Sequence, residues 1–482
     1  MPIDASIETR LRSIVGDKYV LSSAVDLAVY ECDAETLDIA TPDLVVLPKS
    51  TDEVAAVMAL AYEHRIPVSA RGAGTGLSGG ATTVMGGISL VLSRMNKILS
   101  IDAVDRVAVV QVGATNVSVS EAAQRHSLYF APDPSSQAAS TIGGNIAENS
   151  GGPHTLKYGM TTNHVMGLKV VLSNGEVITL GGRSRTKEGL DLLGVFIGSE
   201  GTIGIATEAI LKLIPRAQAV ETMLAYFNTV EAAGQAVSDV IASGVVPAAM
   251  ELVDQLTLNA VEDSWHMGLD RSAGALLIIE LDGPRTGITI QRKKVESCIG
   301  TNNATSVQWA NDAYERAKIW KARKSAFGAL GRIAPHGYVL DGVIPRSKLA
   351  LTISEIAKIA TQYNLTIANV YHAGDGNLHP CILYHKDNAD EVKRVVQAGR
   401  DILELSVRLG GTLSGEHGIG IEKILEMPTV FSEESLESMR WVKQSFDPEN
   451  ICNPGKVIPT PKSCGESGGR PLLRHKLLTS GC

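Results

Sequence analysis

The sequence lacks the cysteine patterns that define several familiar classes of protein. Its six cysteines are scattered along 482 residues, and no two of them form a Cys-x-x-Cys motif. This spacing argues against a disulfide framework and against an iron–sulfur cluster held by this chain, and it favours a reducing compartment. The cysteines are Cys32, Cys298, Cys381, Cys452, Cys464 and Cys482.

Long apolar segments are missing as well. The N-terminal segment MPIDASIETRLRSIVGDKYV contains no continuous apolar stretch of the kind found in signal peptides. No run of about 18 apolar residues, the length that a membrane-spanning helix requires, occurs anywhere. We therefore expect neither secretion nor a transmembrane segment, and any association with a membrane would come through partner proteins.

Long runs of one charge are also absent. The chain has 44 basic and 52 acidic residues, which gives a formal net charge of -8. Proteins that bind nucleic acids concentrate basic residues on one face or stripe, so this composition predicts no nucleic-acid partner. With 482 residues, 44% of them hydrophobic, the chain is long enough for at least two domains with cores of their own.

Two short glycine-rich segments contain three of the 11 histidines. YHAGDGNLHP carries His372 and His379, and SGEHGIG, further along the chain, carries Glu416 and His417. Imidazole and carboxylate groups are ligands of Zn²⁺, and a catalytic site keeps one coordination position open. A histidine that is not a ligand can then take a proton whose acidity the metal has raised. A His-x6-His pair is more often two unrelated loop residues, but the surrounding glycines favour a site with tight turns close to a ligand.

A second set of glycine-rich loops lies in the N-terminal half. RGAGTGLSGGA at 71–81 contains a GxGxxG pattern, but the residues after it predict a loop and a strand instead of the helix that a dinucleotide-binding Rossmann unit requires. Consecutive glycines can still direct several backbone N–H groups into one concavity, with Arg71 nearby as a positive charge. Similar loops follow at 132–152 and 198–205, so we expect a large anionic cofactor.

The elements around these loops indicate a mixed fold. A strand from Leu44 leads through a capping box at Ser50 and Glu53 into a helix, and a second strand covers 66–70. The segment 168–180 is a hairpin around Asn174-Gly175, so part of the sheet is antiparallel. After Pro215 the glycine-rich loops become rare, which predicts a domain boundary near 216.

Together, residues from about 37 to 457 resemble the vanillyl-alcohol oxidase/p-cresol methylhydroxylase family. The motifs are RGAGTGLSGGA, PDPSS, GGNIAENSGGPHTLKYG, GSEGTIG, HAGDGNLHP, SGEHGIG and NPGK. They are most similar to the FAD-linked branch that oxidises D-2-hydroxy acids, which includes the D subunits of bacterial glycolate oxidases and the D-lactate and D-2-hydroxyglutarate dehydrogenases.

This resemblance implies an α+β fold with two domains. One is an FAD-binding domain, and the other is a substrate, or cap, domain with a mainly antiparallel sheet flanked by helices. We expect an N-terminal helical segment at 1–36, the FAD-binding domain at 37–216, the substrate and metal domain at 217–457 and a flexible tail at 458–482.

The resemblance also implies which residues contact FAD. The loops at 71–81 and 132–152 hold the pyrophosphate and the ribityl chain in this family. Glu200, Gly204 and Ile205 are expected near the adenine side or the flavin, and Asn453 at the edge of the isoalloxazine ring. The remaining candidates are Arg71, Gly72, Gly74, Thr75, Gly76, Ser78, Gly79, Pro132, Ser140, Gly143, Gly144, Asn149, Gly151 and Gly152. A plainer interpretation as turn residues is stronger for the glycines than for Arg71, Asn149 or Asn453.

The same resemblance implies the roles of the residues at the metal site. His372, His379 and Glu416 resemble ligands of a divalent metal, with Zn²⁺ first and Mn²⁺ or Fe²⁺ as alternatives, because this donor set suits several ions. His417 resembles the catalytic base. The implied chemistry is metal-assisted removal of the hydroxyl proton together with transfer of the α-hydrogen as hydride to flavin N5.

Two further residues are expected to contact the substrate. Arg323 in IWKARKSAF resembles the arginine that binds the substrate carboxylate, and Asn377 resembles a second contact. A planar guanidinium suits bidentate carboxylate binding. Without the resemblance, Arg323 is equally well one of several charges on a solvated helix, together with Lys318, Lys321 and Lys324.

The implied function is the oxidation of a short D-2-hydroxy acid, glycolate to glyoxylate first and D-lactate to pyruvate second. In YVLDGVIP, uncharged Val339 or a neighbour stands where the hydroxyglutarate-oxidising relatives carry a lysine, which favours a short substrate. A D-lactate or D-2-hydroxyglutarate dehydrogenase is the first alternative. A nicotinamide-dependent dehydrogenase and a non-catalytic subunit are two others.

The resemblance implies partners as well. The chain shows no cluster motif of its own, and the resemblance implies an acceptor other than O₂. The electrons would pass to an FAD-binding subunit and an iron–sulfur subunit of a glycolate oxidase complex. The protein would then lie in the cytoplasm, or peripherally at the inner membrane through those subunits.

Overall fold

The computed structural model describes residues 3–184 and 189–459. The chain divides into two compact units. The first comprises Met1–Gly151, Met160–Arg216 and Glu416–Cys482, and the second comprises Gly152–Gly159 and Ala217–Gly415. The chain therefore enters the second unit twice.

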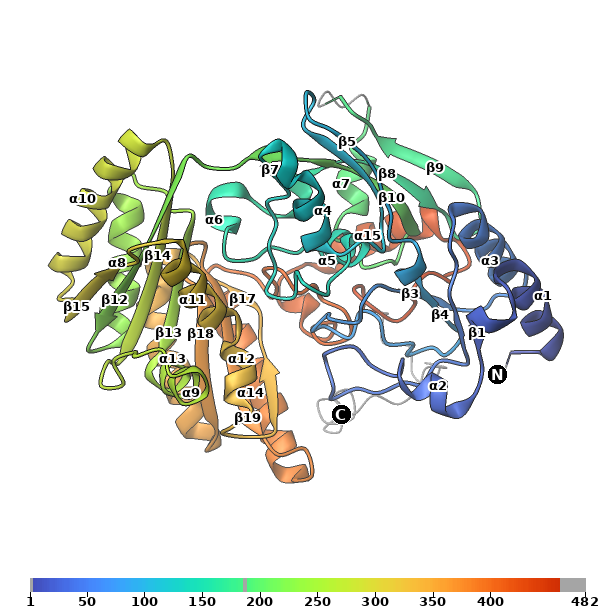
Figure 1. Cartoon of the computed structure of the whole chain (residues 1–482). Coiled ribbons are helices and arrows are strands. Elements are labelled where there is room, and N and C mark those ends of the chain that lie inside the picture. Colours follow the sequence, from blue (N-terminus) through green and yellow to red (C-terminus); the bar gives the residue numbers. More distant parts are fainter. Residues whose placement is uncertain (1–2, 185–188, 460–482) are drawn as a thin grey trace. The chain divides into compact units, whose positions relative to one another are not determined.

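A small sheet with a parallel centre begins the first unit (Figure 1). Its strand order is β1-β2-β4-β3, and β2 and β3 both run parallel to β4. Helix α3 (Thr51–Glu63) connects β2 to β3, and the Ser50 hydroxyl accepts a hydrogen bond from the backbone N–H of Glu53 at 3.2 Å, as the capping pattern predicts. The strands are β1 (Val20–Leu21), β2 (Leu44–Val46), β3 (Val68–Arg71) and β4 (Ile88–Val91), and helix α1 (Ala5–Val15) packs on α3.

A second, antiparallel sheet completes the core of the first unit. Its order is β5-β6-β10-β8-β9, and the hairpin between β8 and β9 turns at Asn174-Gly175 as predicted. One aliphatic core joins the two sheets and includes Leu90 from the first and Val110 from the second. The strands are β5 (Ile98–Asp102), β6 (Val107–Gln111), β8 (Val165–Val171), β9 (Val177–Gly181) and β10 (Ile205–Lys212).

Shorter elements surround these sheets. The glycine loop between β3 and β4 contains no helix, which confirms that its GxGxxG pattern does not open a Rossmann unit. The strands β7 (Leu128–Tyr129) and β11 (Ile214–Pro215) form a separate pair. The helices are α2 (Ala24–Ala28), α4 (Asn116–Ala123), α5 (Ile142–Glu148), α7 (Leu192–Phe196) and α15 (Glu433–Phe446).

The second unit is built on one eight-stranded sheet whose paired strands are antiparallel. The order is β15-β12-β14-β13-β18-β19-β16, and β17 also pairs with β19. The strands are β12 (Ala219–Phe227), β13 (Ala249–Asp254), β14 (Ala275–Gly283), β15 (Ser306–Trp309), β16 (His336–Val339), β17 (Gly342–Val343), β18 (Thr366–His372) and β19 (Asn377–Tyr384).

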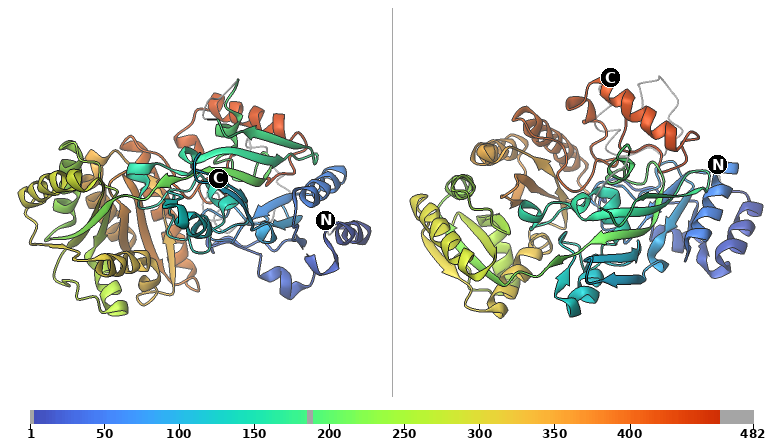
Figure 2. Two further views of the ribbon diagram at one scale, coloured as in Figure 1. Left: turned by 45° about the horizontal axis from the view of Figure 1, so that its top comes forward. Right: turned by 90° about the horizontal axis from the view of Figure 1, so that it is seen from above.

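Helices cover both faces of this sheet (Figures 1 and 2). One layer contains α8 (Val230–Ala242), α10 (Arg285–Thr301), α13 (Leu349–Tyr363) and α14 (Ala389–Arg408). The other contains α9 (Gln255–Trp265), α11 (Ala313–Lys324) and α12 (Ala326–Leu330). The short segment from the first crossing contributes α6 (Thr155–Tyr158), which lies beside β13.

These two units confirm the predicted α+β class with a mainly antiparallel substrate-domain sheet flanked by helices. The chain enters the second unit after Arg216, beside the predicted boundary. The sequence predicted one domain over 217–457. The structure corrects this, because the segment from Glu416 packs with the first unit. The segment 1–36 contains α1 and α2, and of the tail expected at 458–482 only 458 and 459 lie within the described residues.

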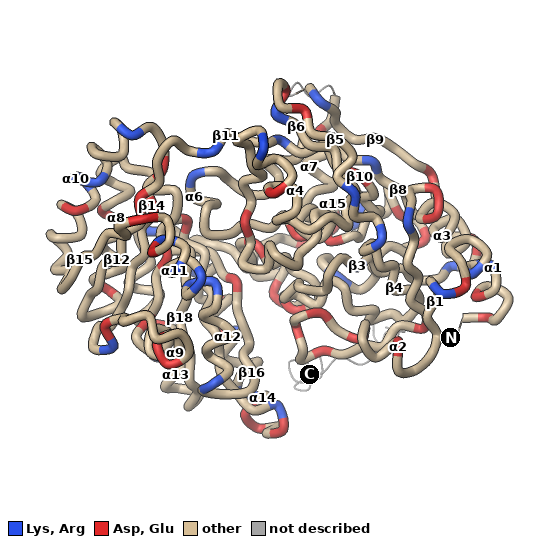
Figure 3. The backbone as a smooth tube through the Cα atoms, in the orientation of Figure 1, with Lys and Arg blue, Asp and Glu red and all other residues tan. Residues whose placement is uncertain are grey.

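The charges are interspersed over both units, as Figure 3 shows for the backbone. Within the described ranges, no helix has the length and apolar character needed to cross a membrane.

Candidate active site

His372 and His379 lie side by side on adjacent strands of the second unit. His372 ends β18, His379 lies in β19, and a tight turn through Gly376 joins the two strands. Gly376 has a φ of +83°, and a Cβ there would lie 2.2 Å from the carbonyl oxygen of Ile344, so the turn requires glycine. The two imidazole centroids are 5.0 Å apart. The His-x6-His spacing is therefore a strand-turn-strand arrangement that brings the two rings together.

Each imidazole is held through its Nδ1 atom. Nδ1 of His372 donates a hydrogen bond to the Glu251 carboxylate at 2.8 Å, and Nδ1 of His379 donates to the carbonyl oxygen of Leu340 at 3.1 Å. Carboxylate and carbonyl oxygens only accept, so Nδ1 carries the proton in both rings. Nε2 is then the atom that each ring presents as a metal ligand, and such Nδ1 contacts are the usual way in which metal-binding histidines are oriented.

Glu251 also pairs with Arg323, the residue expected to bind the substrate carboxylate. Their side chains form an ion pair, and both are at most 1% exposed. Burial alone would raise the pKa of Glu251, but the Arg323 guanidinium and His372 outweigh it and hold this pKa below its usual value. Nε of Arg323 is buried with no hydrogen-bond partner among the described residues. A carboxylate ligand would satisfy this donor.

Asp341 connects the histidine strands to the SGEHGIG segment. Its Oδ1 accepts a hydrogen bond from Nδ2 of Asn377 at 3.0 Å, and its Oδ2 accepts from the Ser414 hydroxyl at 2.5 Å and from the backbone N–H of Gly415 at 3.0 Å. Oδ1 of Asn377 is buried without a hydrogen-bond partner in the described parts of the chain, which suits the predicted substrate contact. Glu416 follows Gly415 directly, where the chain returns to the first unit.

These donors fit a divalent metal. Two imidazoles present Nε2 from one buried face of the second unit, and Glu416 is one peptide bond away from the anchored Gly415, about 3.8 Å between consecutive Cα atoms. With Glu416 as the predicted third ligand, this donor set would match a three-ligand catalytic zinc site and would also suit Mn²⁺ or Fe²⁺. His417, the expected base, is the next residue, and its side chain is 13% exposed.

In the first unit, four glycines of the loop at 71–81 have another atom less than 3.0 Å from where a Cβ would lie, and Gly72 and Gly74 are the most closely packed. A Cβ on Gly72 would lie 2.3 Å from Oγ1 of Thr141, and a Cβ on Gly74 would lie 2.2 Å from the guanidinium of Arg71. Arg71 in turn donates a hydrogen bond to the carbonyl oxygen of Cys32 at 2.9 Å. The loop at 71–81 and the segment that begins α5 are therefore in direct contact, as a shared cofactor site requires.

Several buried polar atoms of the first unit have no hydrogen-bond partner among the described residues. Leaving such an atom unsatisfied costs about 1–3 kcal/mol, so a group of them indicates a polar ligand. FAD suits this group, because its pyrophosphate, ribityl hydroxyls and ring carbonyls offer many hydrogen-bonding atoms. The unsatisfied atoms include Ser78 Oγ, Ser140 Oγ, Asn145 Nδ2, Glu148 Oε2 and Ser199 Oγ.

Glu200 and Asn453 connect the loops of the first unit. The Glu200 carboxylate accepts hydrogen bonds from the backbone N–H groups of Ile419 and Gly420, both at 2.7 Å. Nδ2 of Asn453 donates to the carbonyl oxygens of Gly80 at 3.0 Å and Glu200 at 2.7 Å. Burial raises the pKa of Glu200 to about 7 in spite of its two backbone donors. Both side chains thus bind protein atoms, and the flavin contacts that the resemblance implies for them stay a prediction.

The other expected cofactor residues lie in or beside the same loops. Asn149 ends α5 with a φ of +54°, and its Oδ1 accepts from the backbone N–H of Thr162 at 2.9 Å. The Ile205 side chain is part of the core. Gly151 ends one segment of the first unit, and Gly152 opens the short segment of the second. The rest are Thr75, Gly76 and Gly79 in the first loop, Pro132 in the segment between β7 and α5, Gly143 and Gly144 within α5, and Gly204 before β10.

Two family models match most of the chain. An FAD binding domain matches residues 42–181, and the C-terminal domain of FAD linked oxidases matches residues 216–457. The chain belongs to the FAD-linked oxidase family. This membership confirms the predicted cofactor, FAD, and identifies the protein as an FAD-dependent oxidoreductase.

Relatives of this FAD-linked oxidase match over nearly its full length. Glycolate oxidase subunit GlcD of Escherichia coli (strain K12) is 44% identical, covering 96% of this chain and 93% of that protein. GlcD of Bacillus subtilis is 41% identical, covering 95% and 97%. The D-lactate dehydrogenase of Archaeoglobus fulgidus is 35% identical, covering 86% and 91%.

Solved structures share the fold of this FAD-linked oxidase. The 4-ethylphenol oxidase from Gulosibacter chungangensis superposes with a TM-score of 0.78 at 18% identity, covering 95% of this chain and 97% of that one. p-Cresol methylhydroxylase superposes with a TM-score of 0.77 at 17% identity, covering 94% and 96%. These matches confirm the predicted vanillyl-alcohol-oxidase type of architecture.

Sequence reasoning missed two buried carboxylates, Glu251 and Asp341. Glu251 lies in AMELVD, a strand in which every residue is buried. A charged residue within such an apolar strand is rarely buried without a partner, and that was the available signal. Asp341 lies in YVLDGVIP, two residues after Val339.

Proposed function

We propose that this FAD-linked oxidase oxidises a short D-2-hydroxy acid, with glycolate to glyoxylate as the main reaction and D-lactate to pyruvate as the second. The names of the relatives support this assignment, because two are glycolate oxidase subunits and one is a D-lactate dehydrogenase. The structural observation that carries the proposal is the pair His372 and His379, buried together with both Nδ1 atoms held by acceptors.

Each residue of the proposed site has a separate role in the reaction. Bound FAD supplies a hydride acceptor at N5, and a bound divalent metal supplies a positive charge that increases the acidity of a nearby hydroxyl. His372, His379 and Glu416 would hold the metal, with Zn²⁺ as the first choice. Arg323 would bind the substrate carboxylate through its Nε donor and so fix the orientation of the α-carbon.

His417 is the proposed base that takes the hydroxyl proton. General base catalysis contributes about 10²–10⁴-fold to a rate, so His417→Ala should slow flavin reduction by that factor. His385→Ala is a matched control, because the His385 side chain is 60% exposed and lies outside the proposed site. A His417→Ala protein with a near-normal rate of flavin reduction would remove the base assignment.

The proposed preference for a short substrate is based on the uncharged residue Val339 or a neighbour. The resemblance implies a lysine in the hydroxyglutarate-oxidising relatives where this chain has uncharged Val339 or a neighbour, which favours a substrate with one carboxylate. The second candidate is a D-lactate or D-2-hydroxyglutarate dehydrogenase, and the name of the Archaeoglobus relative favours D-lactate between these two.

We also propose that the electrons leave to an acceptor other than O₂ through partner subunits. The bacterial relatives are named as subunits, and the six cysteines of this chain show no cluster motif. An FAD-binding subunit and an iron–sulfur subunit are the proposed partners. They would also provide any contact with the inner membrane.

A rate panel tests the assignment. The values of kcat/KM for glycolate, D-lactate and D-2-hydroxyglutarate are measured with an artificial electron acceptor. We expect glycolate and D-lactate to be oxidised and D-2-hydroxyglutarate to be the poorest of the three. Highest activity with D-2-hydroxyglutarate would favour the second candidate, and flavin that stays oxidised with all three would exclude the proposed function.

A further inference from the structure

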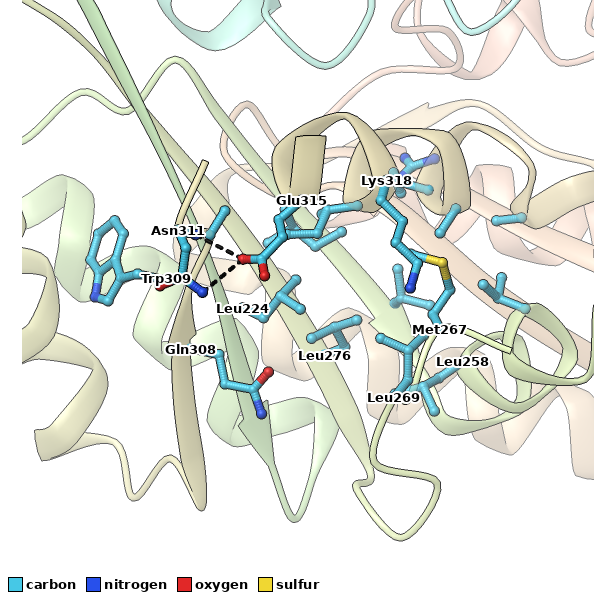
Figure 4. A pocket seen from close by; sticks show the side chains of 18 residues that line it. Leu224, Leu258, Met267, Leu269, Leu276, Gln308, Trp309, Asn311, Glu315 and Lys318 are labelled. Carbon is cyan, nitrogen blue, oxygen red and sulfur yellow. Dashed lines mark hydrogen bonds between the residues drawn. The ribbon is translucent and has the colours of Figure 1, made fainter. Parts of the chain in front are cut away.

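An apolar pocket of about 480 Å³ lies between helix α11 and the sheet of the second unit (Figure 4). Protein interiors contain few voids larger than a water molecule, because side chains fill the space between a helix and a sheet. Here α11 and the residues that flank it contribute three alanines to the wall, which leaves the space open. They are Ala310, Ala322 and Ala326. The volume falls within the range of about 300–1,000 Å³ that is usual for small-molecule sites.

The pocket is separate from the proposed substrate site. The described residues that line it include neither His372 nor His379. Arg323 borders it, but Nε and Nη2 of the guanidinium have almost no accessible surface, so a ligand in the pocket does not meet these donors. The proposed substrate site therefore does not account for this pocket.

Most of the pocket wall is apolar. Leu224 and Leu276 come from the sheet, and Leu258, Met267 and Leu269 come from α9 and the segment after it. Figure 4 shows these five side chains around one space. The wall suits an apolar chain, because a chain bound there removes apolar surface from water.

Lys318 provides a positive charge at the exposed edge of the pocket. It lies one turn before Ala322 on the same face of α11, and Figure 4 shows its side chain turned toward Met267. It forms no ion pair within the described parts of the chain. The carboxylate of Glu315, which also lines the pocket, accepts hydrogen bonds from the backbone N–H and Nδ2 of Asn311 at 2.8 and 3.0 Å. The Lys318 ammonium group is therefore available to a ligand.

These two features select an amphipathic anion with one charge. The ammonium group can donate a charge-assisted hydrogen bond to a carboxylate, and the flexible stem of a lysine lets it follow the head group of the ligand. A second carboxylate farther along the ligand would be buried against the apolar wall without a partner, which costs free energy. The Glu315 carboxylate would repel a doubly charged phosphate group more strongly than a carboxylate. One carboxylate at the end of an apolar chain avoids the first penalty and reduces the second.

We propose that this pocket binds a medium-chain fatty acid, with its chain against the apolar wall and its carboxylate at Lys318. The inference goes beyond the proposed function, because such an acid has no 2-hydroxyl group and is bound without being oxidised. Each methylene moved from water into the pocket should improve binding by about threefold to fourfold. The ion pair with exposed Lys318 should add about fivefold at most, because ion pairs in contact with solvent contribute little.

The first test measures how affinity depends on chain length. Calorimetry compares the binding of butanoate and decanoate to the FAD-loaded protein, at concentrations below those at which decanoate forms micelles. Decanoate has six more methylenes, so we expect it to bind at least about a hundredfold more tightly. Equal affinities for the two acids would overturn the proposal.

A charge reversal tests the position of the carboxylate. Lys318→Glu should weaken decanoate binding by about fivefold and leave the binding of decanol, which has no charge, unchanged. Lys321→Glu is the matched control, because Lys321 is exposed on the same helix and is not among the residues that line the pocket. This control makes the same change in net charge and should bind decanoate like the wild-type protein. Equal weakening in both variants, or none in Lys318→Glu, would contradict the assignment of the carboxylate to Lys318.

A larger side chain tests the position of the apolar chain. Ala322→Phe should fill the pocket and weaken the binding of both decanoate and decanol by about tenfold or more, whereas Ala317→Phe, an exposed change on the same helix, should not. If Ala322→Phe does not fold, Ile319→Trp provides a second filling variant, because Ile319 lines the pocket but is only half-buried. An unchanged affinity for decanoate in the folded filling variant would overturn the proposal.

Inhibition kinetics separate this pocket from the proposed substrate site. Decanoate should not compete with D-lactate in the wild-type protein. Competitive inhibition that persists in both Lys318→Glu and Ala322→Phe would place the acid at the substrate site and overturn the proposal. The binding measurements need no turnover, so a failure to oxidise D-lactate and glycolate would count against the proposed function alone.

Discussion

Glu251 accepts a hydrogen bond from Nδ1 of His372 at 2.8 Å. The same carboxylate forms an ion pair with Arg323, so one fully buried side chain contacts both a candidate metal ligand and the candidate substrate-binding residue. Metal-binding histidines depend on such partners for their tautomer and orientation. Glu251 is therefore a positioning residue of the proposed site.

Replacing Glu251 should weaken metal binding without removing a metal ligand. We expect Glu251→Gln to lower metal affinity by about 10–100-fold, as is usual when the hydrogen-bond partner of a metal-binding histidine is lost. The measurement is the metal content of the purified protein after dialysis against a buffered metal solution. Glu280→Gln is the control, because Glu280 is buried in the same sheet and is bonded to His154 instead. Equal metal content in wild-type protein and Glu251→Gln would contradict the positioning role.

Substituting Arg323 tests the carboxylate site. Arg323→Lys keeps the positive charge beside Glu251 but loses the planar, multiple donors of the guanidinium. One charge-assisted hydrogen bond is worth about 1.5–3 kcal/mol, so the KM for glycolate or D-lactate should rise by about tenfold or more. Lys321→Arg, an exposed change on the same helix, should leave KM unchanged. A normal KM in Arg323→Lys would place the carboxylate elsewhere.

The glycine loop at 71–81 should tolerate no side chain at Gly72. A Cβ there would lie 2.3 Å from Oγ1 of Thr141, and overpacking of this kind costs about 1–3 kcal/mol. We therefore expect Gly72→Ala to retain about tenfold less FAD than the wild-type protein, measured as the ratio of flavin to protein absorbance. Gly182→Ala is the control, because nothing lies within 4 Å of a Cβ at that position. Full flavin content in Gly72→Ala would argue against this loop as the cofactor site.

Glu200 should make the stability of the first unit depend on pH. Burial is the main cause that raises its pKa from the ordinary value of 4.5 to about 7 in the folded protein. Between pH 4.5 and about 7 the Glu200 carboxyl group keeps its proton in the folded protein but loses it in the unfolded chain. The contribution of Glu200 to the stability of the folded state is therefore fully present below pH 4.5 and is lost as the pH rises to about 7. In Glu200→Gln this loss cannot occur. The thermal unfolding midpoint of the variant should fall less than that of wild type between about pH 5 and pH 7.

An exposed carboxyl group provides the comparison for that measurement. Glu121→Gln changes an exposed residue of the first unit and should follow the wild-type pH profile. Identical profiles for wild type and Glu200→Gln would show that the buried carboxyl group does not titrate in this range.

Much of the fold and of the candidate site could be predicted from local sequence. The hairpin at Asn174-Gly175 and the cap at Ser50 are short-range signals, and both appear in the structure as expected. The pairing of His372 with His379 also needed only a glycine turn between two strands. These features depend on residues that are close together in the chain.

The missed features depend on residues that are far apart in the chain. Glu251 meets His372 only because β13 and β18 are neighbours in the sheet, and no local pattern specifies that strand order. The return of the segment after Gly415 to the first unit has the same cause, because it is fixed in part by the contact of Glu200 with Gly420. Long-range pairing of this kind could not be read from one sequence.

The most direct test of the account is flavin reduction with and without the metal. The FAD-loaded protein is mixed anaerobically with glycolate and with D-lactate, before chelation, after chelation confirmed by metal analysis, and after Zn²⁺ is restored. The account predicts rapid loss of the oxidised flavin absorbance before chelation, a much slower loss in metal-free protein, and recovery with Zn²⁺. An unchanged rate in protein shown to be free of metal would contradict it.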